Sequence, residues 1–303
     1  MAGQGQRFVD AGYTDPKPFI KVNGKMIIEY IVDMFDKEND EFYFIICKKH
    51  LSPSYREILL QLVKKYTLFV APENNLGPVY SMLNAEYVKF IDDLESEFPD
   101  PPSGGLMDFI SNDEPVIVSY CDNPFLFDYD TFLQYSIKNT AGVIFSHVGF
   151  HPHRLASTYM AYLKTDPATG ASSPLVTAVQ EKKPYTNYHW SEHASTGTYY
   201  FQKGYYIKKY FKELIDKKLC HTNGEFYVTL VYNLMISDGL EIRAWNSSYV
   251  TVFGTPEEVK NFEAWQTILQ GAQVKEEGQA LSCYHYWKEY NFRKDRLKKL
   301  ILK

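Results

Sequence analysis

Several features that often define a function class are scarce in this chain. Its 303 residues include only four cysteines, which lie far apart without a C-x-x-C pair, so neither a disulfide framework nor a cysteine zinc site is expected. No stretch approaches the roughly 20 consecutive apolar residues of a membrane-spanning helix. Basic residues (32) do not outnumber acidic ones (37), and the net charge of -5 disfavours a general nucleic-acid-binding protein. We therefore expect a cytoplasmic protein with neither a membrane span nor a nucleic-acid partner.

The first half of the chain alternates short apolar runs with amphipathic segments. Hydrophobic residues make up 45% of the chain, enough to bury a large core. The predicted strands are residues 42–48, 67–72, 115–122 and 141–148, and the predicted helices are residues 27–35, 54–66, 78–94 and 129–139. This alternation is typical of an α/β domain with a mainly parallel sheet and right-handed crossovers.

The pattern changes in the second half. Strand-like runs at 158–166, 174–182 and 195–204 predict an antiparallel extension. After them come predicted helices at 205–218, 225–236 and 256–269, with strands at 241–245 and 249–254 before the last helix, while residues 96–109 are a predicted loop insertion. We therefore predict one domain over residues 1–270 and a separate tail over residues 271–303.

The tail ends in the basic segment YNFRKDRLKKLILK. We interpret it as a solvated terminal helix that packs on its own domain; the alternative is a helix that binds a partner or a lipid surface. It is also the candidate surface for a homo-oligomer.

The chain begins MAGQGQRF, a G-x-G-x-R loop of the kind that binds phosphates. A dinucleotide-binding fingerprint needs a third glycine where Phe8 stands, and the NGKMI stretch lacks the Ser or Thr that follows Gly-Lys in a Walker loop. The loop is therefore neither a dinucleotide-binding fingerprint nor a Walker loop. What strengthens the loop is its continuation, because Pro16-Lys17 follows about ten residues later, and a Gly-Lys turn and an apolar helix come next.

This string, Met1 to Val32, resembles the signature of sugar-phosphate nucleotidylyltransferases. The resemblance implies that Ala2, Gly3 and Gly5 bring backbone N–H groups to a nucleoside triphosphate. It also implies catalytic roles for Arg7 at the β- and γ-phosphates and for Lys17 at the transferred phosphate. The physical chemistry agrees, since glycines allow close backbone approach and the two side chains supply fixed positive charge.

Further motifs of the same family resemblance follow in order along the chain. ENNLGPVYSML resembles a base-recognition turn around Gly77, and the strand PVIVSYCD leads to a metal-binding aspartate, Asp122. The later segments QEKKPY, STGTYYF, TNGEFYV and VFGTPEE complete the series. The residues that these segments assign to the sugar phosphate are Glu181, Lys182, Gly197 and Glu225.

The resemblance implies a GT-A-like three-layer sandwich with a mixed, mainly parallel central sheet and a small antiparallel extension. It also implies a reaction in which a nucleoside triphosphate and a sugar 1-phosphate give a nucleotide sugar and pyrophosphate. CKKHL, NGEFYV and GTPEE are similar to a subgroup that serves capsule and surface-polysaccharide assembly.

The cofactor implied is Mg²⁺, held by Asp122 with Glu225 as a second candidate ligand. Many relatives carry an aspartate where this chain has Val252, so the nucleotide's own phosphates and water must complete the coordination. The histidines in SHVGFHPHR (His147, His151 and His153) are interpreted as loop residues near the sugar pocket or on the surface, in preference to a metal site.

Two other functions stay open at this stage. One is a GT-A glycosyltransferase, although its usual Asp-x-Asp is replaced here by Cys121-Asp122-Asn123. The other is a catalytically weak relative that binds a nucleotide sugar as a regulatory subunit. Relatives also place an apolar strand before Met-Ala-Gly, and we expect Met1 to be an internal methionine with such a strand upstream.

Overall fold

The computed structural model describes residues 1–3, 5–88, 104–149, 151, 158–166 and 173–271. The first part contains α1 (Gln6–Asp10), η1 (Lys17–Phe19), β1 (Lys21–Val22), β2 (Lys25–Met26), α2 (Ile27–Val32), β3 (Glu41–Cys47), α3 (Pro53–Leu62), β4 (Lys65–Ala71), α4 (Pro78–Leu83), β5 (Glu86–Tyr87) and α5 (Leu106–Phe109). The second part contains β6 (Val116–Ser119), α6 (Tyr129–Asn139), β7 (Gly142–His147), β8 (Ala161–Asp166), β9 (Leu175–Glu181), β10 (His193–Phe201), α8 (Gly204–Asp216), α9 (Val228–Ser237), β11 (Ile242–Asn246) and α10 (Pro256–Gly271).

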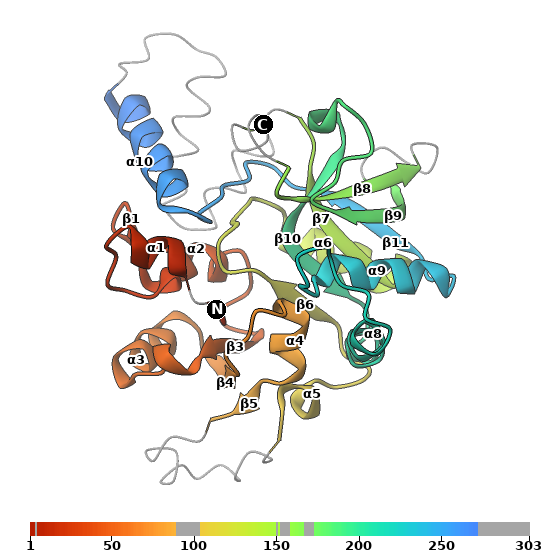
Figure 1. Cartoon of the computed structure of the whole chain (residues 1–303), viewed down its shortest axis with the longest axis horizontal. Coiled ribbons are helices and arrows are strands. Elements are labelled where there is room, and N and C mark those ends of the chain that lie inside the picture. Colours follow the sequence, from red (N-terminus) through yellow and green to blue (C-terminus); the bar gives the residue numbers. More distant parts are fainter. Residues whose placement is uncertain (4, 89–103, 150, 152–157, 167–172, 272–303) are drawn as a thin grey trace.

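The main sheet has the strand order β6-β10-β7-β11-β9-β8. The start of β10 also pairs with β8, so β10, β7, β11, β9 and β8 form a closed ring. A smaller sheet of β3, β4 and β5 lies on the other side of the molecule with α3, and β1 pairs with β2 in a short hairpin (Figure 1).

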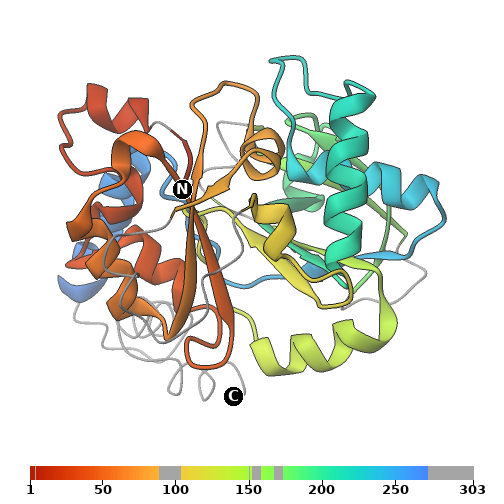
Figure 2. The same cartoon turned by 90° about the horizontal axis from the view of Figure 1, so that it is seen from below.

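Side chains on the main sheet alternate between two faces, as the pleat of a strand requires. On β7, Ile144 belongs to the core cluster that includes α8 and α9. Its neighbours Val143 and Phe145 belong to the cluster that includes α2, α3 and Phe132 of α6. Helices therefore cover both faces of the sheet. In Figure 2, α6 (yellow-green) lies along the lower edge of the molecule, and α8 (teal) and α9 (cyan) lie above it on the right.

The prediction of a mainly parallel central sheet is wrong. Among the strands of the described residues, only β7 with β11 and β3 with β4 pair in parallel, and the other strand pairs are antiparallel. The reason is β10, which inserts between β6 and β7 and runs antiparallel to both. Alternation along the sequence shows that strands and helices follow one another, but it does not show which strands become neighbours. The architecture is a mixed α/β fold.

Several boundaries also differ from prediction. The helix predicted over residues 78–94 ends at Leu83, and β5 follows within the predicted range. Residues 249–254 form no strand: Tyr249 has a left-handed φ of 53°, and the backbone N–H groups of Thr251 and Phe253 donate to the chain after β6. Of the predicted loop insertion at 96–109, residues 106–109 form α5 and residues 96–103 lie outside the described part. His153 and tail residues 272–303, with the expected homo-oligomer surface, lie outside it too.

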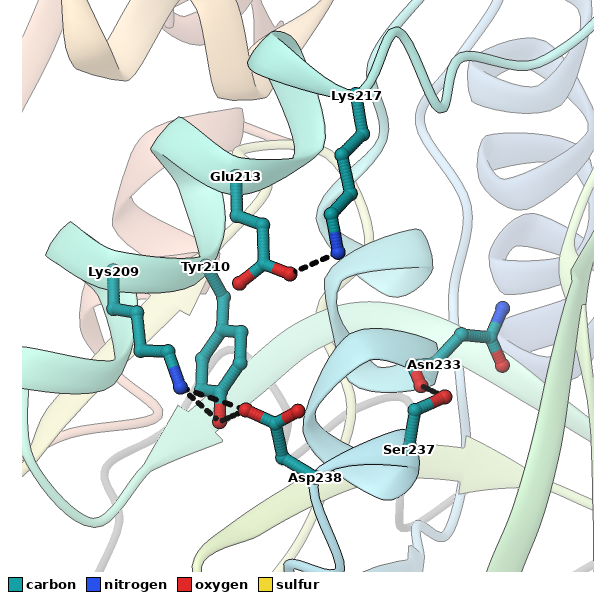
Figure 3. A network of polar contacts seen from close by, with 7 residues as sticks. All are labelled: Lys209, Tyr210, Glu213, Lys217, Asn233, Ser237 and Asp238. Carbon is teal, nitrogen blue, oxygen red and sulfur yellow. Dashed lines mark hydrogen bonds and ion pairs between the residues drawn. The ribbon is translucent and has the colours of Figure 1, made fainter.

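Helices α8 and α9 are fastened by a polar network that we call the helix clasp (Lys209, Tyr210 and Asp238; Figure 3). Lys209 Nζ lies 2.7 Å from a carboxylate oxygen of Asp238, and the hydroxyl of Tyr210 donates to the same oxygen at 2.8 Å. Glu213, in the last turn of α8, forms a further ion pair at 2.5 Å with Lys217, the residue that follows the helix. The contacts of the helix clasp join the middle of α8 to the end of α9. Among the described residues, no helix is both long enough and apolar enough to cross a membrane.

Candidate active site

The glycine loop turns directly into α1. Gly5 has a φ of 65°, and its carbonyl accepts the backbone N–H of Phe8 at 2.9 Å. A Cβ added to Gly5 would lie 3.5 Å from Cβ of Lys17. Phe8, at the place where a dinucleotide-binding loop has its third glycine, is buried in a core cluster. The local fold thus gives Phe8 a packing role and brings the loop against Lys17.

The other candidate residues of the glycine loop, Ala2, Gly3 and Arg7, are more exposed than Phe8. Ala2 is half-buried against the core cluster that includes α8 and α9, and Gly3 is exposed. Arg7 is exposed on α1. Among the residues that the structure describes, Arg7 forms no ion pair and no hydrogen bond with another candidate residue. Its role at the β- and γ-phosphates stays a prediction.

Lys17 and Asp122 form an ion pair across 105 residues of sequence. Lys17 begins η1 and Asp122 lies in the turn after β6, and their side chains are only 17% and 21% exposed. Burial alone would lower the pKa of Lys17, but nearby negative charges, with Asp122 foremost and Glu258 among them, raise it above its ordinary value. The ammonium is therefore charged at neutral pH and is poised beside the glycine loop.

The segment of residues 249–254 runs beside Asp122. The backbone N–H of Phe253 donates to the carbonyl of Asp122 at 2.7 Å, and Thr251 donates to Pro124 at 2.8 Å. Val252 lies between these two contacts and is buried. The position predicted for a second carboxylate is thus adjacent to Asp122, but it carries an apolar side chain.

A different carboxylate lies near this pair. Glu258 stands in the first turn of α10, and a Cβ added to Gly254 would lie 2.9 Å from its carboxylate oxygen Oε2. Its charge contributes to the raised pKa of Lys17. Sequence reasoning missed this residue, although it belongs to the GTPEE motif, because only the three-dimensional fold brings the start of α10 to the end of β6.

Gly77 fits the structure for a reason that involves the backbone of another segment. It has a φ of 89° and precedes α4, and a Cβ there would lie 2.9 Å from the backbone nitrogen of Phe226. Two hydrogen bonds hold the contact: Phe226 N–H donates to Leu76 at 2.8 Å, and Val79 N–H donates to Phe226 at 3.1 Å. Only glycine allows both this φ and this approach. The predicted base-recognition turn is thus attached to the segment that precedes α9.

Gly197 allows a second close approach, near Asp122. It has a φ of 83° at an irregularity in the pairing of β10 with β7. A Cβ there would lie 2.9 Å from the ring of Tyr120 and 3.1 Å from the side-chain nitrogen of Asn123. Its carbonyl accepts the backbone N–H of Tyr120 at 2.9 Å. Gly197 therefore lets β10 pass directly beside the turn that carries Asp122.

Glu181 ends β9 as a buried carboxyl group, with 9% of its surface exposed. Burial raises its pKa to about 7, partly offset by the hydroxyl of Thr229, which donates to it at 2.7 Å, and by the charge of Lys182. Thr229 lies in the first turn of α9. A carboxyl group with this pKa is divided between its neutral and ionised forms at neutral pH, and both forms can accept a hydrogen bond from a hydroxyl group.

Lys182 follows immediately and belongs to what we call the Tyr227 cluster (Lys182, Asn223, Glu225 and Tyr227). The Tyr227 hydroxyl donates to Glu225, and it accepts from Lys182 Nζ and from Asn223 Nδ2, the latter at 3.0 Å. Lys182 has a φ of 56°, a left-handed conformation that costs a non-glycine residue about 1–3 kcal/mol. Burial, together with the hydrogen bond to Glu225, raises the pKa of Tyr227 far above neutrality, so the hydroxyl stays protonated.

The predicted residues thus fall into two groups. The loop residue Gly5, Lys17 and Asp122 form one group, and Glu181 with the Tyr227 cluster forms the other. The buried Tyr199 is influenced by both groups: burial is the main cause of its raised pKa, and the charges of Glu181 and Asp122 add to it. Tyr227 and Thr229 were missed from the sequence. Tyr227 stands within the quoted NGEFYV motif, but nothing in that motif shows that its hydroxyl meets Lys182.

Magnesium fits the residues present only if a substrate completes the coordination. Within the described residues, no group of three or more His, Cys, Asp or Glu side chains is arranged to hold a metal ion. Mg²⁺ commonly takes one or two carboxylates plus substrate phosphates, which Asp122 could share with a bound triphosphate. The carboxylate of Glu225 accepts from the Tyr227 hydroxyl, and its role as a second metal ligand stays a prediction. His147 and His151 pack ring against ring at 5.7 Å, and His151 contacts the carbonyl of Val250 at 2.8 Å.

No protein-family model matches this chain, and no curated protein matches it either. Solved structures do match. A nucleoside-diphosphate-sugar pyrophosphorylase from Vibrio cholerae RC9 has a TM-score of 0.64 and 21% identity over 87% of this chain and 98% of its own. A UDP-glucose pyrophosphorylase complexed with UDP-glucose has a TM-score of 0.60 and 14% identity over 88% and 96%. The UTP-bound UGPase from Acinetobacter baumannii has a TM-score of 0.56 and 13% identity over 90% and 93%. The fold is therefore similar to that of these pyrophosphorylases.

Proposed function

We propose that this protein is a sugar-phosphate nucleotidylyltransferase, which joins a nucleoside triphosphate to a sugar 1-phosphate and releases pyrophosphate. The observation that carries the proposal is the Lys17–Asp122 ion pair, which brings two motifs 105 residues apart together beside the glycine loop. The fold likeness to pyrophosphorylases along nearly their whole length supports the same assignment. We also propose the finer points that the sequence suggests: a GT-A-like sandwich and a role in surface-polysaccharide assembly.

The proposed chemistry needs no general base. A sugar 1-phosphate has a second pKa near 6 and is mostly dianionic at neutral pH, so it is already a nucleophile. The protein must bring two polyanions together, align the attacking and leaving oxygens, and stabilise the charge that moves onto pyrophosphate. These tasks call for fixed cations and backbone N–H groups.

We assign those tasks to residues of the two groups. The loop N–H groups and Arg7 hold the β- and γ-phosphates, and Lys17 exchanges its contact with Asp122 for the transferred phosphate. Lys182 binds the phosphate of the sugar, and Glu181 accepts hydrogen bonds from sugar hydroxyl groups. When Mg²⁺ is bound, Asp122 holds it together with the triphosphate, and it supplies positive charge where negative charge develops.

A pyrophosphate-release screen tests the proposal directly. The purified chain is mixed with CTP, UTP, dTTP, GTP or ATP, each crossed with a panel of sugar 1-phosphates, in the presence and absence of Mg²⁺. We expect release with at least one pair, and its loss in Asp122→Asn. Binding of a nucleotide sugar without release under any condition would overturn the proposal and favour a non-catalytic binding protein. Sugar transfer from a nucleotide sugar would instead indicate a glycosyltransferase.

A further inference from the structure

Tyr227 contacts Lys182 on the predicted sugar side of the site, and its neighbour Phe226 contacts the predicted base turn. We infer that Tyr227 is a positioning residue, which orients Lys182 and Glu225 for the sugar phosphate. This inference rests on the proposed function, because it concerns the same site. It adds a residue to which the sequence analysis assigned no role.

The hydrogen bonds of the Tyr227 hydroxyl have a fixed direction. A tyrosine hydroxyl carries one donor and two acceptor positions. Its proton goes to the carboxylate of Glu225, and its lone pairs take Lys182 Nζ and Asn223 Nδ2. All three positions are therefore used by residues of the cluster. An ammonium has three N–H donors, so the contact with Tyr227 leaves Lys182 able to donate to phosphate oxygens.

The ring of Tyr227 supports the same lysine. Lys182 Nζ lies 4.4 Å from the centroid of the ring, within the range of a cation–π contact. The backbone of Lys182 is held at the same time, since its N–H donates to the carbonyl of Met160 at 3.0 Å. A left-handed lysine that is fixed at both ends is not expected to leave this orientation easily.

Tyr227 is also linked to the predicted base turn through its neighbour. Phe226 exchanges two backbone hydrogen bonds with the turn that contains Gly77, at 2.8 and 3.1 Å. Successive residues thus hold different parts of the site: Phe226 holds the base turn through its backbone, and Tyr227 holds the sugar-phosphate lysine through its hydroxyl. A defect in the hydroxyl alone should therefore change binding of the sugar phosphate and leave the base turn in place.

The experiment compares Tyr227→Phe with a matched control, Tyr210→Phe. Tyr210 also accepts from a lysine and donates to a carboxylate, but it belongs to the helix clasp. That carboxylate follows the end of α9, whose ten residues span about 15 Å from the start near Tyr227. KM for the sugar 1-phosphate, KM for the nucleotide and kcat are measured on the pair that releases pyrophosphate, together with Tm for each variant.

We expect Tyr227→Phe to raise the sugar 1-phosphate KM about tenfold and to leave the nucleotide KM within about twofold. Tyr210→Phe should leave both unchanged. In a Lys182→Ala background, Tyr227→Phe should add less than about twofold, because the residue acts through the lysine. An unchanged sugar-phosphate KM, or an equal rise in both KM values, would overturn the inference while the proposed function stands. Wild-type protein without any pyrophosphate release would overturn both.

Discussion

Two clusters in this protein use the same three chemical groups in different ways. In the helix clasp, Lys209 Nζ lies 4.4 Å from the ring centroid of Tyr210, whose hydroxyl donates to Asp238. In the Tyr227 cluster, Lys182 Nζ lies at the same 4.4 Å from its tyrosine ring, and that hydroxyl also donates to a carboxylate. The local chemistry is therefore nearly identical.

The surroundings of the two clusters differ. Lys209 and Tyr210 are neighbours on a regular helix, and the side chains of Lys209 and Asp238 are 37% and 45% exposed. Lys182, by contrast, has a left-handed backbone and meets a tyrosine 45 residues away, beside the glycine contact at Phe226. Strained backbone persists only where the surrounding structure enforces it, and it is concentrated at functional sites. The comparison indicates that the clasp fastens two helices, whereas the Tyr227 cluster holds groups for binding.

The largest expected effect is on the glycine that supports the Tyr227 cluster. Gly77→Ala must force a side chain into a backbone conformation that suits only glycine and to 2.9 Å from Phe226. We expect a loss of about 3–4 kcal/mol in the free energy of unfolding. The matched control is Gly239→Ala beside the helix clasp, where φ is also positive but the added Cβ meets nothing within 4 Å, and where we expect about 1 kcal/mol. Urea unfolding measures both; equal losses would contradict the packing explanation.

The next largest effect is expected from replacing Lys182, whereas replacing Lys209 should change KM very little. Lys182→Ala removes the cation assigned to the sugar phosphate, and we expect the sugar 1-phosphate KM to rise about 100-fold, as for the loss of a charged hydrogen bond worth about 2.7 kcal/mol. Lys209→Ala removes a cation in the same local setting and should change KM less than about twofold. Steady-state kinetics on the productive substrate pair provide the measurement. A similar KM change in both variants would remove the functional distinction between the clusters.

The contributions of Glu181 and Asp238 to stability should change with pH in opposite directions. Burial raises the pKa of Glu181 from 4.5 to about 7, so the folded protein retains this proton more tightly than the unfolded chain. Stability from this group is complete below pH 4.5 and is lost as the pH rises through 7. Relative to Glu181→Gln, wild-type protein should lose about 2 kcal/mol between pH 5 and pH 8. Unfolding of both proteins in urea at the two pH values tests this; a constant difference would show that Glu181 is ionised throughout.

The contrasting carboxylate is Asp238 of the helix clasp. Its hydrogen bonds from Lys209 and Tyr210 lower its pKa, so its contribution is present above its unfolded pKa and is lost as the pH falls through the lower folded value. The sign is therefore opposite to that of Glu181. Comparing Asp238→Asn with wild-type protein between pH 5 and pH 2 should show their difference shrinking with acid.

The smallest effect is expected from the ion pair at the end of α8. Glu213 and Lys217 are one turn apart and partly exposed. Such pairs stabilise a helix by about 0.3–0.5 kcal/mol and are screened by salt. Lys217→Ala should therefore lower the free energy of unfolding by no more than this at low salt and by less in 1 M NaCl. A larger or salt-independent loss would mean that Lys217 stabilises the end of α8 through more than this ion pair.

The sequence predicted most elements because hydrophobic period is a local property. The helix at residues 129–139 and the strands near 42–48, 67–72 and 141–148 agree with α6, β3, β4 and β7. Sequence-based predictions were wrong for segments whose secondary structure depends on contacts with distant parts of the chain. Residues 249–254 have the composition of a strand, but they form none, and the backbone N–H groups of Thr251 and Phe253 donate to the chain after β6. β5 replaces part of a predicted helix because β4 is available to pair with it.

For the site, the sequence by itself determined the chemical groups: a glycine loop with Arg7 and Lys17, an aspartate after a strand, and the Glu181-Lys182 pair. Only the tertiary structure decided which of them meet. It joined Lys17 to Asp122, inserted β10 between β6 and β7, and set the Tyr227 hydroxyl against Lys182. The physical reason is that periodicity and turn chemistry depend on neighbours along the chain, whereas strand order, buried ion pairs and close glycine contacts depend on segments that only folding brings together.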